Sequence, residues 1–538
     1  MAVNSSLSGS AKTAFTRTAS GLVREVSLRD AAGFGTLATG GFYGLVYLYP
    51  FPQAFAPGIS IPVLIFVTLA VAAMAYFCYA ALGSAMPRAG GDYLYQTRAL
   101  HRLIGFTIPW MCQVLFWLAF GSVGAYVINQ FGLVPLMTTL GLDGAATWLS
   151  GALGSFVVTA VAIVSMWALV VAGLRVYRRV QQWVLLPGLA IGAVTIIVVL
   201  IANWNTDFTK AFDAFYGGSL TVASVKEAAA GLGDANPAFN WHNTLIFIGI
   251  LIGGSFGYTM YAAQGLLGEV KDAANLRRLF LAFLIPGIIV AIGMLLVPWL
   301  LLQHIVGDTF LNEYAIAYAN GAVDPGIQPN IGVFAQMLAP NKIVGVLLSL
   351  GFLAGGYGIA VTVFMNVARV MMAMSFDGLL PSFLSDVWRR TFTPAKAMTV
   401  WSAISLGVAA WFYLSPRWET AILFGAAATS LLVVCVTCFA AGLFPFTAPE
   451  IYSSAPVAGR KVGSVPLVTL VGLIAGAILA VTVYWAVTED AIGLTFRDAR
   501  IALIAAFVSG FVFYALWWIY RRSTGVDVSL TTREVPPE

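Results

Sequence analysis

The sequence predicts an all-α polytopic membrane protein with twelve transmembrane helices. Three observations predict this fold class. Of the 538 residues, 60% are hydrophobic and only 9% are charged, whereas soluble domains carry about 25% charged residues. Twelve apolar runs are long enough to cross a bilayer, which takes about 20 residues. Glycines interrupt two of these runs, the first and the sixth.

The predicted spans follow one another at short intervals, except around two long loops. The spans are residues 31–51, 61–84, 103–133, 147–171, 180–202, 244–267, 279–303, 343–374, 397–414, 421–446, 465–487 and 501–520. Gly, Asn, Asp and Pro punctuate the loops 203–243 and 304–342. These loops either hold short helices that cap an outer vestibule or are plain surface connections.

The distribution of basic residues predicts the orientation. Twelve spans put both termini on one side, and Lys and Arg collect in cytoplasmic loops. With the N-terminus inside, all but six of the 28 Lys and Arg fall in internal segments; the exceptions are Lys210, Lys226, Lys342, Arg417, Arg497 and Arg500. We therefore expect a multi-pass protein of the cell membrane with cytoplasmic tails at 1–30 and 522–538. The basic clusters are topology anchors, and no nucleic-acid partner is expected.

The glycine interruptions indicate where a solute binds. The first run contains Thr39-Gly40-Gly41, and the sixth contains Gly253-Gly254-Ser255-Phe256-Gly257-Tyr258. A broken helix exposes backbone N–H and C=O groups in the membrane, which is tolerated only where they line a cavity or are buried in protein. Matched broken spans in two halves of a chain are typical of secondary transporters. Close helix packing is the alternative use of each glycine.

If the first and sixth spans correspond, the chain consists of two five-helix units of opposite orientation. The first unit covers residues 31–203 and the second covers 244–446, with an extracytoplasmic loop at 204–243 between them. The odd number of spans in each unit inverts the second unit relative to the first. Helices eleven and twelve, within residues 447–521, are then peripheral.

Three loop segments resemble the motifs of a known family. Residues 87–95 read Pro-Arg-Ala-Gly-Gly-Asp-Tyr-Leu-Tyr, and residues 268–271 read Gly-Glu-Val-Lys. Residues 369–381 read Arg-Val-Met-Met-Ala-Met-Ser-Phe-Asp-Gly-Leu-Leu-Pro. In this order the segments resemble the Pro-Arg-x-Gly-Gly-x-Tyr-x-Tyr, Glu-Val-Lys and Arg…Ala-Met-x-x-Asp-Gly-x-Leu-Pro motifs of the amino acid–polyamine–organocation (APC) permeases.

The resemblance implies a LeuT-like fold with a 5+5 inverted repeat and two unwound helices, the first and the sixth. In such permeases the first break holds the substrate α-carboxylate on backbone N–H groups at a helix N-terminus. The second break holds the α-ammonium on freed carbonyls. The substrate-binding residues implied here are Thr39, Gly40, Gly41, Phe42, Gly254, Ser255, Phe256, Gly257 and Tyr258. Aromatic residues beside the breaks either close over the substrate or belong to the core: Phe42, Tyr43, Phe256, Tyr258 and Tyr261.

The loop motifs also imply an inner gate on the cytoplasmic side. Its residues are Arg88, Gly90, Gly91, Tyr93, Glu269, Lys271, Arg369 and Asp377. Gly90-Gly91 lets the chain turn sharply after the second span. Arg369 and Asp377 lie about two helical turns apart, so we expect each to meet another loop rather than the other. Ordinary helix-end charges are the alternative.

No Asp, Glu, Lys or Arg lies well inside a predicted span, where a proton relay would be expected. The position that matches a Lys used by some proton-coupled members is Gly188. We therefore expect uncoupled transport, exchange, or an ion held on carbonyls and hydroxyls, with Thr362 as a candidate Na⁺ ligand and H⁺ as the other coupling ion to test. No other cofactor and no metal site is expected, because Cys435 and Cys438 have no second Cys pair or His nearby.

The absence of a buried carboxylate also bears on the substrate. A cationic side chain would need such a partner, since an unpaired buried charge is costly, so a neutral amino acid is favoured. An organic amine or polyamine permease and an amino acid exchanger are the alternatives. An enzyme would need a catalytic cluster and a channel a pore loop or charged ring. The sequence thus predicts a non-enzymatic secondary active transporter that works by alternating access in a lipid membrane, with homo-oligomerisation open.

Overall fold

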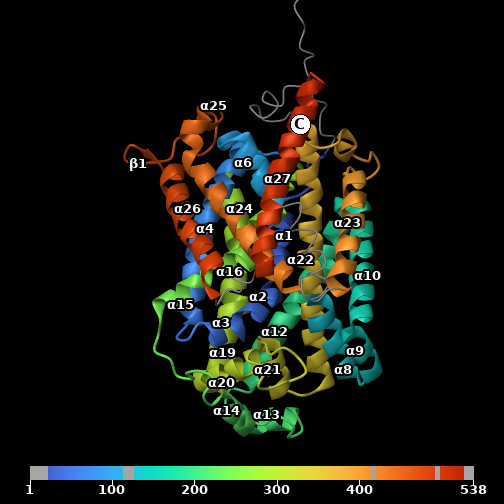
Figure 1. Cartoon of the computed structure of the whole chain (residues 1–538), viewed down its shortest axis with the longest axis vertical. Helices are drawn as coiled ribbons and strands as arrows, with labels where there is room; N and C mark the ends of the chain where they lie inside the picture. The colour runs from blue at the N-terminus through green and yellow to red at the C-terminus, as the bar shows by residue number, and fades with distance from the viewer. Residues whose placement is uncertain (1–21, 113–126, 415–418, 491–496, 526–538) are drawn as a thin grey trace, which may run out of the picture.

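Long apolar helices run side by side along one axis of the molecule (Figure 1). The computed structural model describes residues 22–112, 127–414, 419–490 and 497–525. The short helix α25 (Pro449–Ser453) and the C-terminal end of α27 (Arg497–Ser523) lie at one end of this axis, while α13 (Phe208–Phe215) and α14 (Val222–Ala229) lie at the other. We name these the inner end and the outer end.

Within the described ranges, nine helical segments are long and apolar enough to cross a membrane. They are Ile61–Ala85, Ala152–Val171, Leu174–Ala202, Trp241–Met260, Leu276–Val306, Lys342–Phe376, Ala427–Thr447, Leu467–Thr488 and Arg500–Ser523. Each coincides with a predicted span, which confirms an all-α multi-pass membrane protein. Of the other three predicted spans, the first is divided into two short helices, and the third runs partly outside the described residues. The ninth is α23 (Ala395–Leu414).

Within the described residues, the first five predicted spans are built from α-helices and π-helical turns. In chain order the elements are α1 (Leu28–Thr39), α2 (Gly41–Leu48), α3 (Phe51–Phe55), α4 (Ile61–Ala85), α5 (Gly91–Ala99), α6 (Arg102–Pro109), the π-turn η2 (Ile128–Leu133), α8 (Val134–Leu140), α9 (Asp143–Ser150), α10 (Ala152–Val171), α11 (Leu174–Val180), the π-turn η3 (Gln181–Leu185) and α12 (Leu186–Ala202).

The second half is similar in composition and ends with a small hairpin and two more helices. Its elements are α15 (Trp241–Ile246), α16 (Ile248–Leu251), the π-turn η4 (Ile252–Phe256), α17 (Gly257–Gln264), the 3₁₀ turn η5 (Leu267–Glu269), α18 (Leu276–Ile288), the π-turn η6 (Ile289–Leu296), α19 (Val297–Val306), α20 (Asp308–Ala319), α21 (Ile331–Leu338), α22 (Lys342–Phe376), the 3₁₀ turn η7 (Ser382–Ser385), α23, α24 (Glu419–Thr447), α25, the antiparallel strands β1 (Lys461–Val462) and β2 (Val465–Pro466), α26 (Leu467–Thr488) and α27 (Arg497–Ser523).

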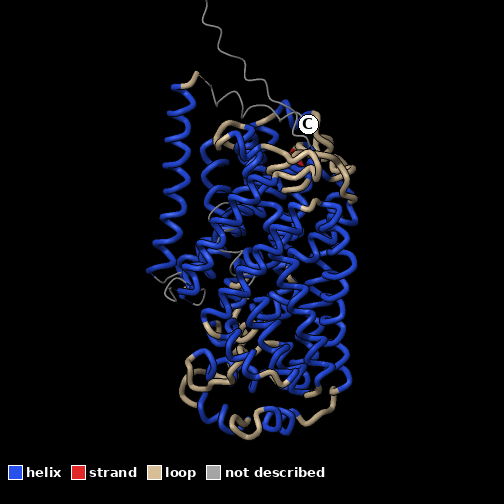
Figure 2. Tube along the Cα trace, turned by 90° about the vertical axis from the view of Figure 1, so that its right-hand side faces the viewer, coloured by secondary structure: helices blue, strands red, loops and turns tan. Residues whose placement is uncertain are grey.

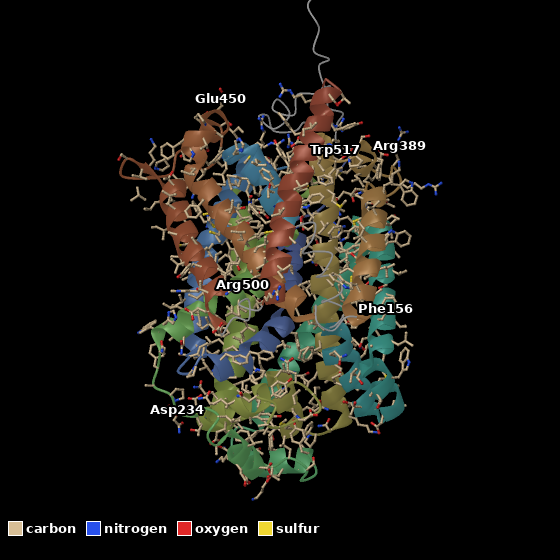
Figure 3. The ribbon with its side chains drawn as sticks, in the orientation of Figure 1. Phe156, Asp234, Arg389, Glu450, Arg500 and Trp517 are labelled. Carbon is tan, nitrogen blue, oxygen red and sulfur yellow. The ribbon has the colours of Figure 1, made fainter. Side chains whose placement is uncertain are left out.

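Both long loops hold short helices at the outer end, as one of the two interpretations of the sequence expected. The first loop contains α13 and α14, and the second contains α20 and α21. Figure 3 shows the resulting polarity: Arg389 and Glu450 lie towards the inner end and Asp234 lies at the outer end. The outer helices therefore cover the bundle instead of only connecting it.

At the first helix, α1 packs against α2, α17 and α22, and α22 also packs against α2 and α17. Small residues permit the closest approaches, as is common between membrane helices. A Cβ on Gly351 of α22 would lie 2.8 Å from the Cα of Gly192 on α12. The last two helices are peripheral: α26 packs against α24 and α4, and α27 packs against α6 and α24. Figure 2 shows one helix standing at the edge of the bundle.

Candidate functional site

The first helix is interrupted where its glycines predict. α1 ends at Thr39 because Gly40 adopts a left-handed conformation, with φ 60° and ψ 56°. An L-residue with a side chain would be strained there by about 1–2 kcal/mol, which glycine avoids. α2 starts at Gly41, and no side chain caps its N-terminus. A buried, uncapped helix N-terminus in the core of the bundle is suited to hold an anion on its N–H groups.

The sixth helix differs from the expectation. Instead of an unwound segment at residues 254–258, the structure has a π-helical turn at Ile252–Phe256 that continues directly into α17. A π-turn is wider than an α-turn and keeps most backbone groups bonded within the helix. Glycine here serves close packing, since a Cβ on Gly253 would lie 2.1 Å from the carbonyl oxygen of Ala427. Such π-turns frequently mark functional sites.

The break in the first helix and the π-turn of the sixth are in direct contact. Ser255 Oγ donates a hydrogen bond of 2.7 Å to the carbonyl oxygen of Thr39. Thr39 Oγ1 donates to the carbonyl of Gly35 at 2.6 Å and also meets Thr259 Oγ1. Since one hydroxyl carries a single proton, Thr259 is the donor in the second contact. The two elements therefore share a hydroxyl network at the break.

A tyrosine from α4 completes this network. Tyr76 OH donates to the carbonyl of Phe256 at 3.2 Å and lies 3.4 Å from Thr259 Oγ1. Thr39, Ser255 and Thr259 are fully buried. The carbonyls of Thr39 and Phe256 thus accept hydrogen bonds from hydroxyl groups of neighbouring helices.

The side chain of Phe42 serves packing. Its ring lies edge-on to Phe352, with centroids 4.8 Å apart. The ring also fills the space that side chains at Gly192 and Gly351 would need. The predicted substrate contact of Phe42 can therefore come only from its backbone.

The aromatic residues of the sixth helix are buried. Phe256 is fully buried and Tyr258 is 1% exposed. Both lie in or beside the π-turn, so either can cover a solute at the break or belong to the core, as the sequence left open. The side chains of Tyr43 and Tyr261 lie outside the described residues.

Thr362 lies on α22, on the side that faces the first helix and the start of the fifth. Its hydroxyl donates to the carbonyl of Gly358 at 2.6 Å and meets Tyr177 OH at 3.0 Å. The ring of Tyr177 stacks on Phe34 of α1, with centroids 5.4 Å apart. Gly188 faces α22 closely, since a Cβ there would lie 2.7 Å from the Cβ of Ala354. A lysine at this position would require the helices to separate.

The inner end is held by two buried ion pairs. In the first, Arg369 on α22 binds Glu269, which follows the sixth helix, with Nε–Oε1 at 2.8 Å and Nη2–Oε2 at 3.3 Å. The side chains are 0% and 3% exposed. The backbone next to Glu269 pairs with the N-terminal segment, because Val26 N–H donates to the Glu269 carbonyl at 2.9 Å. Helices one, six and eight are thus joined at this point.

In the second pair, Asp377 at the end of α22 binds Arg98 of α5. Arg98 Nη1–Oδ2 is 2.7 Å and Nη2–Oδ1 is 3.0 Å, and Tyr93 OH donates to Oδ2 at 2.7 Å. Burial acts to lower the pKa of Arg98, but the charge and hydrogen bonds of Asp377 outweigh it and raise the pKa. Arg369 and Asp377 therefore bind different loops, as their spacing led us to expect.

The remaining predicted gate residues shape the inner loops. Gly90 and Gly91 have φ of 121° and 49°, and a Cβ on Gly90 would lie 2.7 Å from the Cβ of Ala373. Arg88 is half-buried, and burial followed by the charge of Arg24 lowers its pKa. Lys271 is exposed; its N–H donates to the Val26 carbonyl at 2.8 Å. It lies outside the two ion pairs.

Sequence reasoning missed three residues of these clusters. Arg98 lies five residues after Tyr93 in the helix that follows Gly90-Gly91, but it is not itself a residue of the motif. Thr259 follows the glycine-rich segment of the sixth span without belonging to a motif, and Tyr76 belongs to no motif. A hydroxyl on each side of a glycine break is the signal that could have identified Thr259.

The described helices form a polytopic membrane bundle in which the first and sixth helices meet at a break and a π-turn. Comparisons with known proteins identify the family of this bundle. The amino acid permease family matches residues 30–525, which is most of the chain. The protein therefore belongs to the amino acid permease family of the APC superfamily.

One similar protein is the methylthioribose transporter of Bacillus subtilis (strain 168). It is 22% identical over 351 residues, which is 64% of this chain and 65% of that protein. The match thus spans somewhat less than two thirds of the relative's length. It agrees with the transporter class, and it is too distant to fix the substrate.

Proposed function

We propose that the protein is a secondary transporter that moves a small neutral amino acid across the cell membrane by alternating access. The solute's carboxylate binds the N–H groups at the start of α2. Its ammonium binds carbonyls at Thr39 and in the π-turn of the sixth helix. The observation that carries the proposal is the contact between Ser255 and the Thr39 carbonyl, 2.7 Å at the helix break.

The charges near this site support a neutral solute. The residues at the break and the π-turn are uncharged, and the buried charged side chains of the described ranges belong to the inner half: Asp30, Asp92, Arg98, Glu269, Arg369 and Asp377. A cationic side chain bound at the break would lack a carboxylate partner, which is costly in a buried site. A zwitterion is neutral overall and needs only oriented backbone dipoles.

The inner end faces the cytoplasm in this proposal, and both termini lie there. The two five-helix units, 31–203 and 244–446, form the moving parts. The inner ion pairs break when the site opens inward and form again when it opens outward. The driving force is exchange or an ion bound on hydroxyls and carbonyls, because the break itself holds no titratable carboxylate or amine.

A second candidate substrate is favoured by the relative's name. Methylthioribose is a neutral polar solute, and hydroxyls at Thr39, Ser255 and Thr259 suit sugar hydroxyls as well as an ammonium. This chain would then transport a neutral sugar thioether instead of an amino acid.

Counterflow in liposomes decides between the two. Proteoliposomes are preloaded with a mixture of unlabelled neutral amino acids or with methylthioribose, and uptake of the labelled solute is followed against protein-free liposomes. This assay needs no knowledge of a coupling ion. We expect counterflow with neutral amino acids. Counterflow with methylthioribose alone would replace the substrate, and none with either solute would refute the proposed function.

A further inference from the structure

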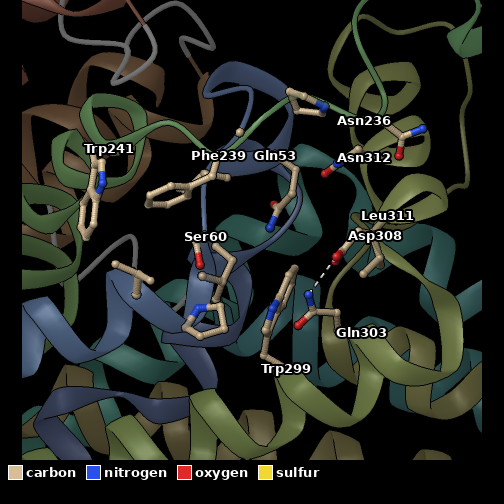
Figure 4. A pocket seen from close by; sticks show the side chains of 16 residues that line it. Gln53, Ser60, Asn236, Phe239, Trp241, Trp299, Gln303, Asp308, Leu311 and Asn312 are labelled. Carbon is tan, nitrogen blue, oxygen red and sulfur yellow. Dashed lines mark hydrogen bonds between the residues drawn. The ribbon is translucent and has the colours of Figure 1, made fainter.

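A cavity of about 580 Å³ opens at the outer end, away from the helix-one break. It lies where the segment from α3 to the start of α4 meets residues 236–241 and the junction of α19 with α20. Figure 4 shows Gln53 in the middle of this space, with Trp299 and Ser60 beside it and Asp308 across from it. Its volume is in the range of small-molecule sites, about 300–1,000 Å³.

Two buried polar groups point to a ligand in this cavity. Gln53 is 5% exposed, and neither its amide nitrogen nor its amide oxygen has a hydrogen-bond partner in the described part of the chain. The indole Nε1 of Trp299, which is 3% exposed, also has none there. Leaving such a group unsatisfied costs about 1–3 kcal/mol. The two side chains therefore offer N–H donors that a bound molecule can use.

The cavity carries a negative charge on one side of Gln53 and aromatic rings on the other (Figure 4). Asp308 is the one charged side chain among the sixteen that line the cavity. Gln303 Nε2 donates to its Oδ2 at 2.9 Å, which orients the carboxylate. Phe239 and Trp241 are about half exposed and contact each other, with centroids 4.9 Å apart. A carboxylate is a partner for an ammonium group, and the two aromatic rings on the other side of Gln53 offer an apolar surface (Figure 4).

We propose that this outer cavity binds a zwitterionic amino acid with an apolar side chain. The solute's carboxylate accepts from Gln53 Nε2 and Trp299 Nε1, its ammonium binds Asp308, and its side chain lies against Phe239 and Trp241. The inference rests on the proposed function, because the outer cavity binds the same class of solute that binds at the helix-one break during transport. It is a second, separate site, because its residues belong to the outer loops and helix ends.

A cysteine reporter tests the site directly. The four native cysteines are buried, so Ser60→Cys, on the cavity wall, supplies an accessible thiol. The purified full-length protein is labelled with a maleimide while L-leucine, leucinol or N-acetyl-leucine is added. Leucinol lacks the carboxylate and N-acetyl-leucine lacks the ammonium. With leucine about ninefold above its Kd, one tenth of the sites remain free, so labelling slows about tenfold.

Three variants locate the protection. Asp308→Asn in the Ser60→Cys protein should abolish protection by leucine and leave the labelling rate without leucine unchanged. Gly41→Ala, at the central break, should leave protection intact. Ser219→Cys, exposed on the loop between α13 and α14, should react at the same rate with and without leucine.

Protection by leucine alone, lost with Asp308→Asn and kept with Gly41→Ala, supports the proposal. Equal protection by leucinol refutes the carboxylate contact. Protection lost with Gly41→Ala means that the effect comes from the central site, and no protection means that the cavity holds solvent only; each overturns the proposal. Because labelling does not depend on transport, these outcomes are independent of the counterflow result.

Discussion

The two ends of the bundle are closed by different chemistry. At the inner end, Glu269–Arg369 and Arg98–Asp377 are buried ion pairs with two hydrogen bonds each. At the outer end, aromatic rings pack together: Phe334 lies 5.4 Å from Tyr49 and 6.0 Å from Phe208, and Tyr314 lies 5.9 Å from Phe310, all between centroids. One end depends on charge and the other on shape.

This difference between the two ends indicates how each of them can open. A buried ion pair has a narrow geometry and, once separated, leaves two charges that need water. The inner end is therefore either closed, with its ion pairs formed, or open, with the ion pairs separated and water around the charges. Aromatic rings can slide past each other with little directional penalty, since offset and edge-on contacts differ little in energy. The outer end can adapt its shape to a solute step by step.

The largest effect is expected at the inner end. Arg369→Ala leaves Glu269 buried without its partner and should lower the free energy of unfolding by about 3–5 kcal/mol. Equilibrium unfolding in mixed micelles measures this. The double variant Glu269→Ala/Arg369→Ala should lose less than the sum of the two single variants. If the losses of the two single variants added up to the loss of the double variant, the interaction between Glu269 and Arg369 would contribute nothing to stability.

A smaller effect is expected for the aromatic outer end. Phe334→Leu removes ring contacts with Tyr49, Phe208 and Tyr314. Because each such pair contributes about 0.5–1.5 kcal/mol, a loss of about 2 kcal/mol is expected. The loss should be the same at low and high ionic strength. A strong salt dependence would remove the distinction between the two ends.

A single hydroxyl sharpens the comparison further. Tyr216 OH and Tyr314 OH lie 3.0 Å apart. Tyr314→Phe removes this hydrogen bond while keeping the ring, so the expected loss is about 1 kcal/mol. Tyr318→Phe on the same helix is the matched control and should change little. A loss as large as that of Phe334→Leu would mean that polar contacts, and not ring packing, hold the outer end.

The smallest effect concerns an exposed ion pair at the inner end. Hydrogen bonding from Arg175, with Nε–Oε2 at 2.7 Å, lowers the pKa of Glu25 below its ordinary value of 4.5. A lowered pKa stabilises the fold above the unfolded-state value, and this contribution is lost as the pH falls through the folded-state value. Since Arg175 is exposed, solvent screens the pair and its contribution to stability is small.

Arg175→Met tests the sign of this dependence. The variant should be slightly less stable than the native protein at pH 7 and equally stable once the pH is well below 4.5. Unfolding series at several pH values check it. A difference that grew as the pH fell would contradict the assigned role of Glu25.

The break in the first helix could be predicted because it depends on local residues. Gly40 needs a left-handed conformation that a glycine adopts freely, and this is visible in the sequence. The π-turn of the sixth helix could not be predicted, because the same Gly-Gly-Ser-Phe-Gly pattern suits an unwound segment and a closely packed helix. The packing of Gly253 on Ala427 decides between them.

The inner ion pairs show a second limit. The motifs identified Glu269, Arg369, Tyr93 and Asp377 as loop residues, but not their partners. Arg98 and Asp377 are 279 positions apart, and Glu269 and Arg369 are 100 apart. Such pairings are set by how the helices assemble, which local patterns do not encode.

The most direct test of the account compares two neighbouring glycines of α2. Added Cβ atoms at Gly41 and Gly44 would both crowd η6, with the nearest atoms at 2.5 Å on Met294 and 3.0 Å on Leu295. Only Gly41 lies at the break. We predict that Gly41→Ala abolishes counterflow of neutral amino acids while Gly44→Ala retains it. Equal activity of the two variants, both folded, would contradict a binding site at the helix-one break.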